Sequence, residues 1–302
     1  DNSELQEISC FAFSESQIKK LTLPETVTKI SPGCFYKCSK LEKINIPKSI
    51  EIIDYVTFSF TNLSSITIPK SVTKIGYGSF YKCQKLCKVL FEEGSNLNEI
   101  EALAFSETSL SSILIPKSVN KIGDFCFTNC TLLKSITFEE NSVLQYIGEK
   151  CFNGTQITDF QLPSSIEYCD FSDTKANKIS FPSSCSLLKI SNFNSTQITE
   201  FVIPSSVEKI GKSAFVRCQN LAIVKVADIS NSKLTEIEEK AFLGCNSLKE
   251  FELPKTVGYF GSQSFEDCEQ FNCKISLETS NLKVCEFAFH NSGVTSFETS
   301  SD

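Results

Sequence analysis

The sequence predicts a repeat solenoid, a coil in which short units of similar sequence stack on one another. Three observations predict it: a motif that recurs about every 23 residues, a phenylalanine at one fixed place in most copies, and a proline at another. Such units bury their apolar side only against their neighbours, which is why they occur in series. The stretches "KSVTKIGYGSFYKCQKL" at 70–86 and "SSVEKIGKSAFVRCQNL" at 205–221 show how closely two copies agree.

Each copy begins with an apolar residue, and thirteen copies follow one another at spacings of 20 to 27 residues. Their first residues are Ile8, Ile30, Ile53, Ile75, Ile100, Ile122, Ile147, Cys169, Ile190, Ile210, Ile237, Phe260 and Val284. Five positions later, eleven copies carry Phe13, Phe35, Phe58, Phe80, Phe105, Phe127, Phe152, Phe215, Phe242, Phe265 and Phe289. Because each ring meets the ring of the next copy, the series predicts an aromatic spine. In the short copies at 169–209, Phe171 and Phe193 are expected to fill this place.

Each copy contains a segment of the form L-x-x-I-x-I-P that predicts a β-strand. In Leu41–Pro47, the apolar Ile44 and Ile46 alternate with Asn45, as in a strand with one buried face. The proline has no N–H to donate to a ladder, so it ends the strand. The Ile-Gly pair that follows, which ends at Gly76 in one copy, predicts a turn that tolerates positive φ. The Phe-x-x-Cys stretch predicts a turn or a short helical piece.

Three copies carry longer inserts, which we expect to be surface loops on one flank. The inserts are 91–99, 138–146 and 226–236. The short copies at 169–209 are expected to change the curvature locally. Because no linker or break in composition divides the chain, residues 1–302 are predicted to form a single solenoid of about 13 repeats. The segments 1–7 and 297–302 read as partial repeats, so we expect the chain to be a fragment of a longer protein.

The composition argues against several classes of function. With 29 basic and 36 acidic residues, the chain has a net charge of −7 and lacks a basic footprint for nucleic acid. It has no run of about eighteen apolar residues, so no membrane insertion is predicted. The single histidine, His290, disfavours Ser-His-Asp and Cys-His catalysis and excludes multi-histidine metal sites. We therefore predict no catalytic, cofactor-binding or metal-binding residues and no enzyme activity.

Fifteen cysteines are an odd number, so they cannot all pair within one chain. Six of them lie three residues after a spine phenylalanine and three lie directly before one, at places where other copies have alanine, serine or threonine. Such exchange indicates a small buried slot, so we expect stacked thiols, with disulfides as the less favoured alternative and a metal site as the least. The cysteines off these slots are candidates for a disulfide or a reactive thiol: Cys87, Cys185, Cys273 and Cys285.

These units resemble the BspA-like leucine-rich repeats, whose hallmark is the unit seen at 114–136, "LIPKSVNKIGDFCFTNCTLLKSI". The inserts that begin with Phe-Glu-Glu are similar to those of large surface antigens of parasitic protists, and bacteria of mucosal surfaces carry related arrays. The resemblance covers essentially the whole chain. It implies a right-handed solenoid with parallel β-strands on one face and turns or short helical pieces on the other. It supplies no catalytic residues and no fixed ligand motif.

The resemblance also implies a function, because family members are typically secreted or surface-exposed and implicated in adhesion. We therefore expect a noncatalytic recognition module, an extracellular or cell-surface antigen that binds protein or glycan ligands on host cells, matrix or other microbes. The alternative from another class is a cytoplasmic leucine-rich-repeat scaffold for protein–protein interaction. The many unpaired thiols favour that alternative, since thiols stay reduced in the cytosol.

The strand face that points away from the core is the expected docking surface of such a solenoid. Its side chains are polar and of mixed charge, with no aromatic cluster, which predicts weak or multivalent binding. The candidate partner-binding residues are Lys134, Thr137, Asp159, Gln161, Lys178, Ser180, Glu200 and Lys225. Four Asn-x-Ser/Thr motifs are candidate N-glycosylation sites: Asn62, Asn129, Asn153 and Asn194. In a chain so rich in serine, threonine and asparagine, four matches are expected by chance, so their number is no evidence for secretion.

Overall fold

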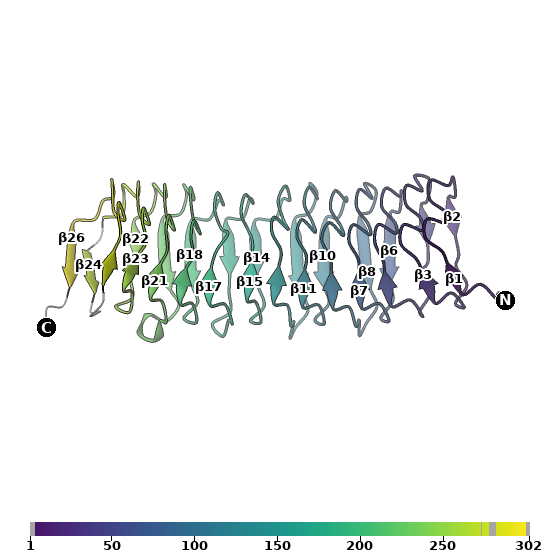
Figure 1. Ribbon diagram of the computed structural model, residues 1–302, viewed down its shortest axis with the longest axis horizontal. Helices are drawn as coiled ribbons and strands as arrows, with labels where there is room; N and C mark the ends of the chain where they lie inside the picture. Colours follow the sequence, from purple (N-terminus) through teal and green to yellow (C-terminus); the bar gives the residue numbers. More distant parts are fainter. Residues whose placement is uncertain (1–3, 273, 278–281, 300–302) are drawn as a thin grey trace. The chain divides into compact units, whose positions relative to one another are not determined.

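A computed structural model describes residues 4–272, 274–277 and 282–299 of the chain. It confirms the predicted solenoid, a coil of short parallel β-strands with almost no helix (Figure 1). Contacts within the chain divide it into two compact units, Asp1–Ile157 and Thr158–Asp302, which we call unit 1 and unit 2 and describe separately. The single solenoid of about 13 repeats stays a prediction.

In unit 1, each turn of the coil contributes strands to two rows. The even-numbered strands form the even row, which consists of β2 (Lys20–Leu21), β4 (Lys43–Ile44), β6 (Ser65–Ile68), β8 (Lys88–Phe91), β10 (Ser112–Ile115) and β12 (Ser135–Phe138). The odd-numbered strands form the odd row, which consists of β1 (Glu7–Ile8), β3 (Lys29–Ile30), β5 (Ile52–Ile53), β7 (Lys74–Ile75), β9 (Glu99–Ile100), β11 (Lys121–Ile122) and β13 (Tyr146–Ile147). Paired strands are parallel and in register, as Ile113 with Ile136.

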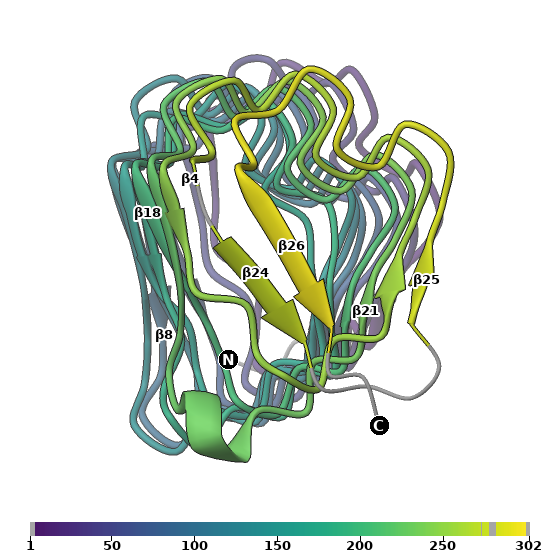
Figure 2. The ribbon, with the colours of Figure 1, turned by 90° about the vertical axis from the view of Figure 1, so that its left-hand side faces the viewer.

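Unit 2 repeats this arrangement. Its even row consists of β14 (Asp159–Gln161), β16 (Lys178–Ser180), β18 (Glu200–Ile203), β20 (Ile223–Val226), β22 (Glu250–Phe251), β24 (Lys274–Leu277) and β26 (Ser296–Thr299). Its odd row consists of β15 (Tyr168–Cys169), β17 (Lys189–Ile190), β19 (Lys209–Ile210), β21 (Glu236–Ile237), β23 (Tyr259–Phe260) and β25 (Lys283–Val284). In the end-on view, β18 and β21 lie on opposite sides of the coil, and the short helix η1 (Ile229–Asn231) extends the insert at 226–236 below them (Figure 2).

The odd row corrects the sequence prediction, which placed strands on one face only. Each odd strand is a two-residue pair such as Lys121–Ile122, whose lysine is exposed and whose isoleucine is buried. The prediction assigned the Ile-Gly pairs, which overlap these strands, to turns, and two residues are too few to show a period of two. The even strands are also shorter than predicted in places: in the predicted strand Leu41–Pro47, only Lys43–Ile44 pair as β4.

The reason given for the Ile-Gly pair is also corrected. The backbone of Gly76 is not left-handed, and positive φ occurs at other glycines, such as Gly78. What the position requires is closeness between turns. A Cβ atom at Gly123 would lie 2.5 Å from the backbone nitrogen of Ala102 in the neighbouring turn, closer than any real Cβ contact. The glycine therefore lets one turn rest directly on the next.

The Phe-x-x-Cys stretches are turns, and within the described ranges the one helical segment is η1. Two residues of each such turn are left-handed, and most of them are not glycine. In the turn around Phe127, they are Phe125 with φ 55° and Asn129 with φ 58°. Left-handed backbone costs a non-glycine residue roughly 1–2 kcal/mol, so neighbouring turns must hold it in place.

The predicted aromatic spine is confirmed in both units. From Phe13 to Phe152, consecutive rings of unit 1 lie 5.3–5.8 Å apart with interplanar angles of 1–15°. In unit 2, Phe171 and Phe193 fill the spine of the short copies as predicted, and both are fully buried. Their rings are tilted by 33° because these copies reach the spine by a shorter path.

The buried cysteines are hydrogen-bond donors as well as core residues. The thiol of Cys83 donates to the carbonyl of Phe58 at 3.0 Å, and that of Cys130 donates to Phe105 at 3.0 Å. Where a copy has threonine instead, as at Thr108, the hydroxyl donates to the same kind of carbonyl, here Phe105 at 2.8 Å. All fourteen cysteines of the described residues are free thiols, in agreement with the favoured prediction.

Candidate recognition surfaces

The even row presents the surface that the sequence predicts as the docking face. In unit 1, Lys134 lies just before β12 and Thr137 lies within it, and both are exposed. The other six candidate residues belong to unit 2 and project from four neighbouring strands: Asp159 and Gln161 from β14, Lys178 and Ser180 from β16, Glu200 from β18, and Lys225 from β20. All are exposed except Ser180, which is half-buried. The structure therefore brings these six together on one side of unit 2.

Charges of opposite sign alternate along this face of unit 2. Asp159 lies beside Lys178 in the register of β14 and β16. Glu200 and Lys225 form an ion pair at 2.8 Å, which raises the pKa of Lys225. Both partners are exposed to solvent, so the pair orders the surface more than it stabilises the fold. A ligand with matching alternate charges would find them in place.

Apolar side chains on the even row correct the prediction of a purely polar face. Leu90 on β8, Leu114 on β10 and Val202 on β18 are 44%, 50% and 42% exposed. They occupy the second outward position of their strands, where most other copies have a polar residue. The sequence signal for them was present, since each sits between two apolar residues that point inward.

The odd row carries a second charged surface that the sequence analysis missed. In unit 1, Lys29 pairs with Glu7 at 2.7 Å, and Lys121 pairs with Glu99 at 2.9 Å. The first pairing lowers the pKa of Glu7 and raises that of Lys29. In unit 2, Lys209 pairs with Glu236 at 2.9 Å. Ion pairs therefore link neighbouring turns along the odd row.

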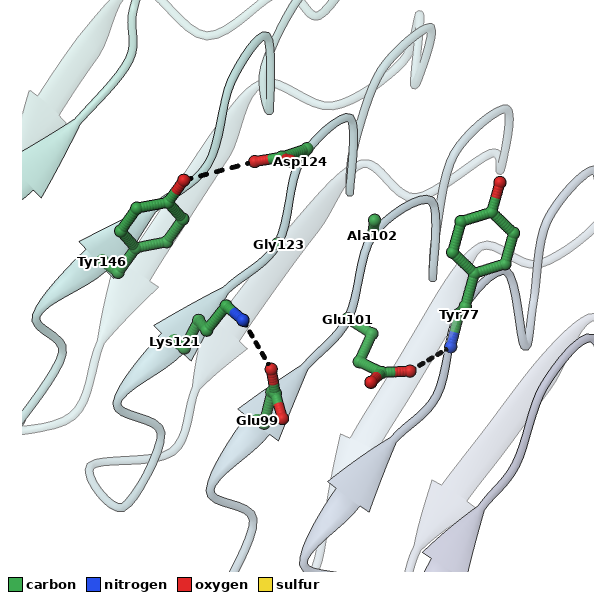
Figure 3. A pocket seen from close by; sticks show the side chains of 8 residues that line it. All are labelled: Tyr77, Glu99, Glu101, Ala102, Lys121, Gly123, Asp124 and Tyr146. Carbon is green, nitrogen blue, oxygen red and sulfur yellow. Dashed lines mark hydrogen bonds and ion pairs between the residues drawn. The ribbon is translucent and has the colours of Figure 1, made fainter.

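A pocket of about 430 Å³ opens beside the odd row of unit 1 (Figure 3). Tyr77 and Tyr146 lie at its two ends, and Ala102 lies between them. Its charged side chains already have partners within the protein: Glu101 accepts from the backbone N–H of Tyr77 at 2.7 Å, and Lys121 binds Glu99. Across the described ranges, no group of three or more His, Cys, Asp or Glu residues is placed to hold a metal ion.

An aromatic cluster on the turns of unit 1 was also missed. It consists of Tyr36, Tyr55, Phe60, Tyr77 and Tyr81. Tyr55 and Tyr77 are stacked at 5.5 Å and are 49% and 41% exposed. Phe60 meets Tyr36 and Tyr81 edge-on, at 5.7 and 5.5 Å. Tyr36 and Tyr81 share one position of the repeat and Tyr55 and Tyr77 share another, whereas Phe60 stands where the two neighbouring copies have lysine. Stacking of the turns brings these positions together.

Two grooves flank Phe60. The aromatic groove, of about 550 Å³, is lined by the aromatic cluster. The polar groove, of about 630 Å³, is lined by Phe60 together with Asn62, Gln84 and two Lys–Glu pairs. Of the four candidate glycosylation sites, Asn129 is exposed, whereas Asn62, which borders this groove, and Asn153 and Asn194 are half-buried.

The candidate reactive thiols have different surroundings. Cys87 is exposed, Cys285 is half-buried, and Cys185 is buried, with its pKa raised by desolvation. Cys273 lies outside the described residues. Cys10 is a further exposed thiol that the sequence analysis did not single out.

Among the residues that the structure describes, none belongs to a helix long and apolar enough to cross a membrane. A family model described as BspA type leucine rich repeat region, with 6 copies, matches the chain at 6–122, 51–174, 98–222 and 219–302. No curated protein matches the chain.

Several solved structures are similar to the chain. A leucine-rich repeat protein from Bacteroides ovatus is 23% identical, with 97% of this chain and 76% of that one covered and a TM-score of 0.59. A leucine-rich repeat protein from Eubacterium ventriosum is 20% identical over 88% and 81%, with a TM-score of 0.51. The pneumococcal vaccine antigen PcpA is 22% identical over 94% and 78%, with a TM-score of 0.49. The first two likenesses concern the fold alone.

Proposed function

This chain belongs to the BspA-type leucine-rich repeat family, and from that premise we propose that it is a noncatalytic recognition module, secreted or held at a cell surface. Its ligands are proteins or glycans on host cells, matrix or other microbes, and its docking surface is the even row. The observation that carries the proposal is the outward face of unit 2, where Asp159, Lys178, Glu200 and Lys225 alternate in charge on neighbouring strands. These side chains are exposed and take no part in the core.

A face made of side chains from several neighbouring strands suits a large partner better than a small molecule. Each strand offers one or two side chains to a ligand, so contacts add up along the row and weak individual contacts give useful avidity. Exposed charges chiefly determine which partner docks and how fast it does so. Val202 on β18 adds exposed apolar surface, and its burial by a partner would contribute favourable hydrophobic free energy to binding.

Charge reversal on unit 2 tests the proposal. The fluorescently labelled protein is incubated with cultured epithelial cells, with plates coated with extracellular matrix, and with whole microbial cells. The double variant Asp159→Lys with Lys178→Glu is expected to bind at least one of these surfaces about tenfold more weakly, which corresponds to about 1.4 kcal/mol. The control is Lys150→Glu, an exposed lysine on a turn away from the even row. Equal binding by wild type and double variant would exclude this face as the docking surface.

An intracellular scaffold is the second candidate, and the free thiols favour it. Fourteen unpaired cysteines in the described residues are typical of a reducing compartment. Most of them are buried, however, and a buried thiol is protected from oxidants wherever the protein resides. The intact mass of protein from its native source, alkylated before reduction, separates the candidates: attached sugar places the chain in the secretory pathway, and its absence together with fifteen alkylated thiols favours the scaffold.

A further inference from the structure

We propose that Asn62 carries an N-linked glycan whose first sugars pack on Phe60 and occupy the polar groove of unit 1. The inference rests on the proposed extracellular function, because this sugar is added in the secretory pathway. In the transfer, the amide Nδ2 of Asn62 forms a bond to C1 of the first sugar of a lipid-diphosphate-linked oligosaccharide. The bond from C1 to the phosphate oxygen breaks, the lipid diphosphate leaves, and a base of the transferase takes the amide proton.

The backbone holds the acceptor motif outward. Thr61 and Leu63 point into the core and are 2% and 0% exposed, whereas Asn62 between them is half-buried and Ser64 is exposed. The side chain of Asn62 makes no hydrogen bond to any residue that the structure describes, and it borders the polar groove. A glycan on this nitrogen therefore begins inside the groove.

Phe60 offers the sugar an aromatic ring, over which the ammonium nitrogen of Lys82 lies 5.6 Å from the ring centroid. Phe60 lies two residues before Asn62, lines the same groove and is half-buried. Edge-on contacts with Tyr36 and Tyr81 fix the orientation of its ring. Binding of a sugar therefore costs little conformational entropy of this side chain. The C–H groups on one face of a pyranose are apolar and pack on aromatic rings as other apolar groups do.

The rest of the groove matches a neutral, hydroxyl-rich occupant. Lys37 lies 3.7 Å from Glu15, and Lys82 lies 3.7 Å from Glu107, so the charges on the two rims cancel. Gln84 lines the groove beside them and can donate to and accept from hydroxyl groups. The groove has little net charge, so it would attract a charged partner only weakly. A neutral sugar can form hydrogen bonds with its polar side chains.

The other three motifs lack one of these features. Asn129 also follows a phenylalanine by two residues, but that ring, Phe127, is fully buried in the spine. In the remaining two motifs, the threonine hydroxyl is inside the core: Thr155 donates to the carbonyl of Phe152 at 2.8 Å, and Thr196 donates to that of Phe193 at 2.8 Å. Asn129 is therefore the matched control, since it shares the spacing without an accessible ring.

The experiment expresses the full chain behind a secretion signal in cultured mammalian cells and, without glycans, in bacteria. Peptide mass spectrometry gives the occupancy of Asn62 and Asn129. Thermal midpoints are compared for wild type, Asn62→Gln, Phe60→Lys and the double variant. Lysine is chosen because Lys37 and Lys82 occupy the same position, with the same left-handed backbone, in the two neighbouring turns. Asn129→Gln is made in parallel.

The expected result is a glycan on Asn62 and a fall of about 2–4 °C in the midpoint of the secreted protein with Asn62→Gln. This fall disappears in the Phe60→Lys background and in the bacterial proteins, while Asn129→Gln changes the midpoint by less than about 1 °C. An empty Asn62, or an equal fall in both backgrounds, overturns the inference. Because secretion is imposed and no ligand is used, either outcome is distinct from a failure of the proposed function, which the cell-binding assay measures.

Discussion

At the residue scale, Phe127 is the clearest test of the core. Its ring is fully buried between those of Phe105 and Phe152, at 5.6 and 5.8 Å. We expect Phe127→Ala to lower the free energy of unfolding by about 3–5 kcal/mol, because it removes ring contacts on both sides and leaves a cavity. Urea denaturation followed by circular dichroism measures it. The control Phe125→Ala, at a partly exposed ring in the same turn, should cost far less; a loss below about 1 kcal/mol at Phe127 would contradict the spine.

The slot of Cys130 tests whether buried thiols stabilise by hydrogen bonding or only by filling space. Its sulfur lies 3.2 Å from the hydroxyl of Thr108 and donates to the carbonyl of Phe105. Cys130→Thr keeps a donor and should change the stability by less than about 1 kcal/mol. Cys130→Val has the same shape without the donor and should cost about 1–2 kcal/mol more. Urea titrations of both variants measure this difference. Equal stabilities would show that the side chain at this position stabilises the fold by packing alone.

Burial of the thiols predicts a loss of stability at alkaline pH. Desolvation raises the pKa of Cys83 to about 11, against an unfolded value of 9.0. Below pH 9 both states hold the proton; as the pH rises from 9 to 11, the unfolded state loses it first, so the free energy of unfolding falls. The expected loss is on the order of 2 kcal/mol for this thiol. Urea midpoints from pH 8 to 11 measure it, and a Cys83→Thr variant with an unchanged pH dependence would argue against the assignment.

Among single residues, the sequence predicted the spine and the buried thiols because both recur at fixed spacing. It could not predict the hydrogen bond of Cys130 to Phe105, since that contact joins successive turns and depends on how they stack. The reason for glycine at Gly76 was wrong for the same cause: the demand comes from the neighbouring turn, and not from the local dihedral angle.

At the element scale, the odd row shows how closely the turns approach one another. Gly123 follows β11 directly, and a methyl group there would meet the backbone of Ala102 at 2.5 Å. We expect Gly123→Ala to cost about 1–3 kcal/mol, the range for overpacking in a core that cannot move aside. Differential scanning calorimetry of the variant measures the loss. The control is Gly94→Ala, in the insert at 91–99, where nothing lies within 4 Å and only the left-handed backbone is strained. A smaller loss at Gly123 than at Gly94 would refute the close approach.

Sequence predicted the even row well because segments such as Ser65–Ile68 alternate polar and apolar residues over four positions. The odd strands have two residues each, so their pairing follows from the stacking of turns and leaves no periodic signal of its own. For the candidate site the division is similar. The outward positions of unit 2 were predictable from alternation. The aromatic cluster around Phe60 was not, because its edge-on contacts join rings from different positions of neighbouring copies and depend on how the turns stack.

At the scale of the whole molecule, exposure divides the thiols into two classes. Cys10 and Cys87 are exposed, whereas most of the others that the structure describes are buried in the stacked turns. Iodoacetamide should therefore modify these two within minutes in the native protein, and the buried thiols only after denaturant is added. Peptide mass spectrometry at successive times gives the rates. Rapid modification of Cys83 or Cys130 in native protein would show that the turns open far more often than their packing suggests.

The spine also determines how a unit responds to force. Each turn contacts chiefly the turns beside it, and consecutive rings from Phe13 to Phe152 repeat nearly the same geometry. A pull on the end of such a stack therefore peels off one turn at a time, and each step meets a similar resistance. A tether built in this way lengthens under shear by the unfolding of one turn after another. It absorbs mechanical work in many small, reversible steps and does not fail in one event at its weakest contact.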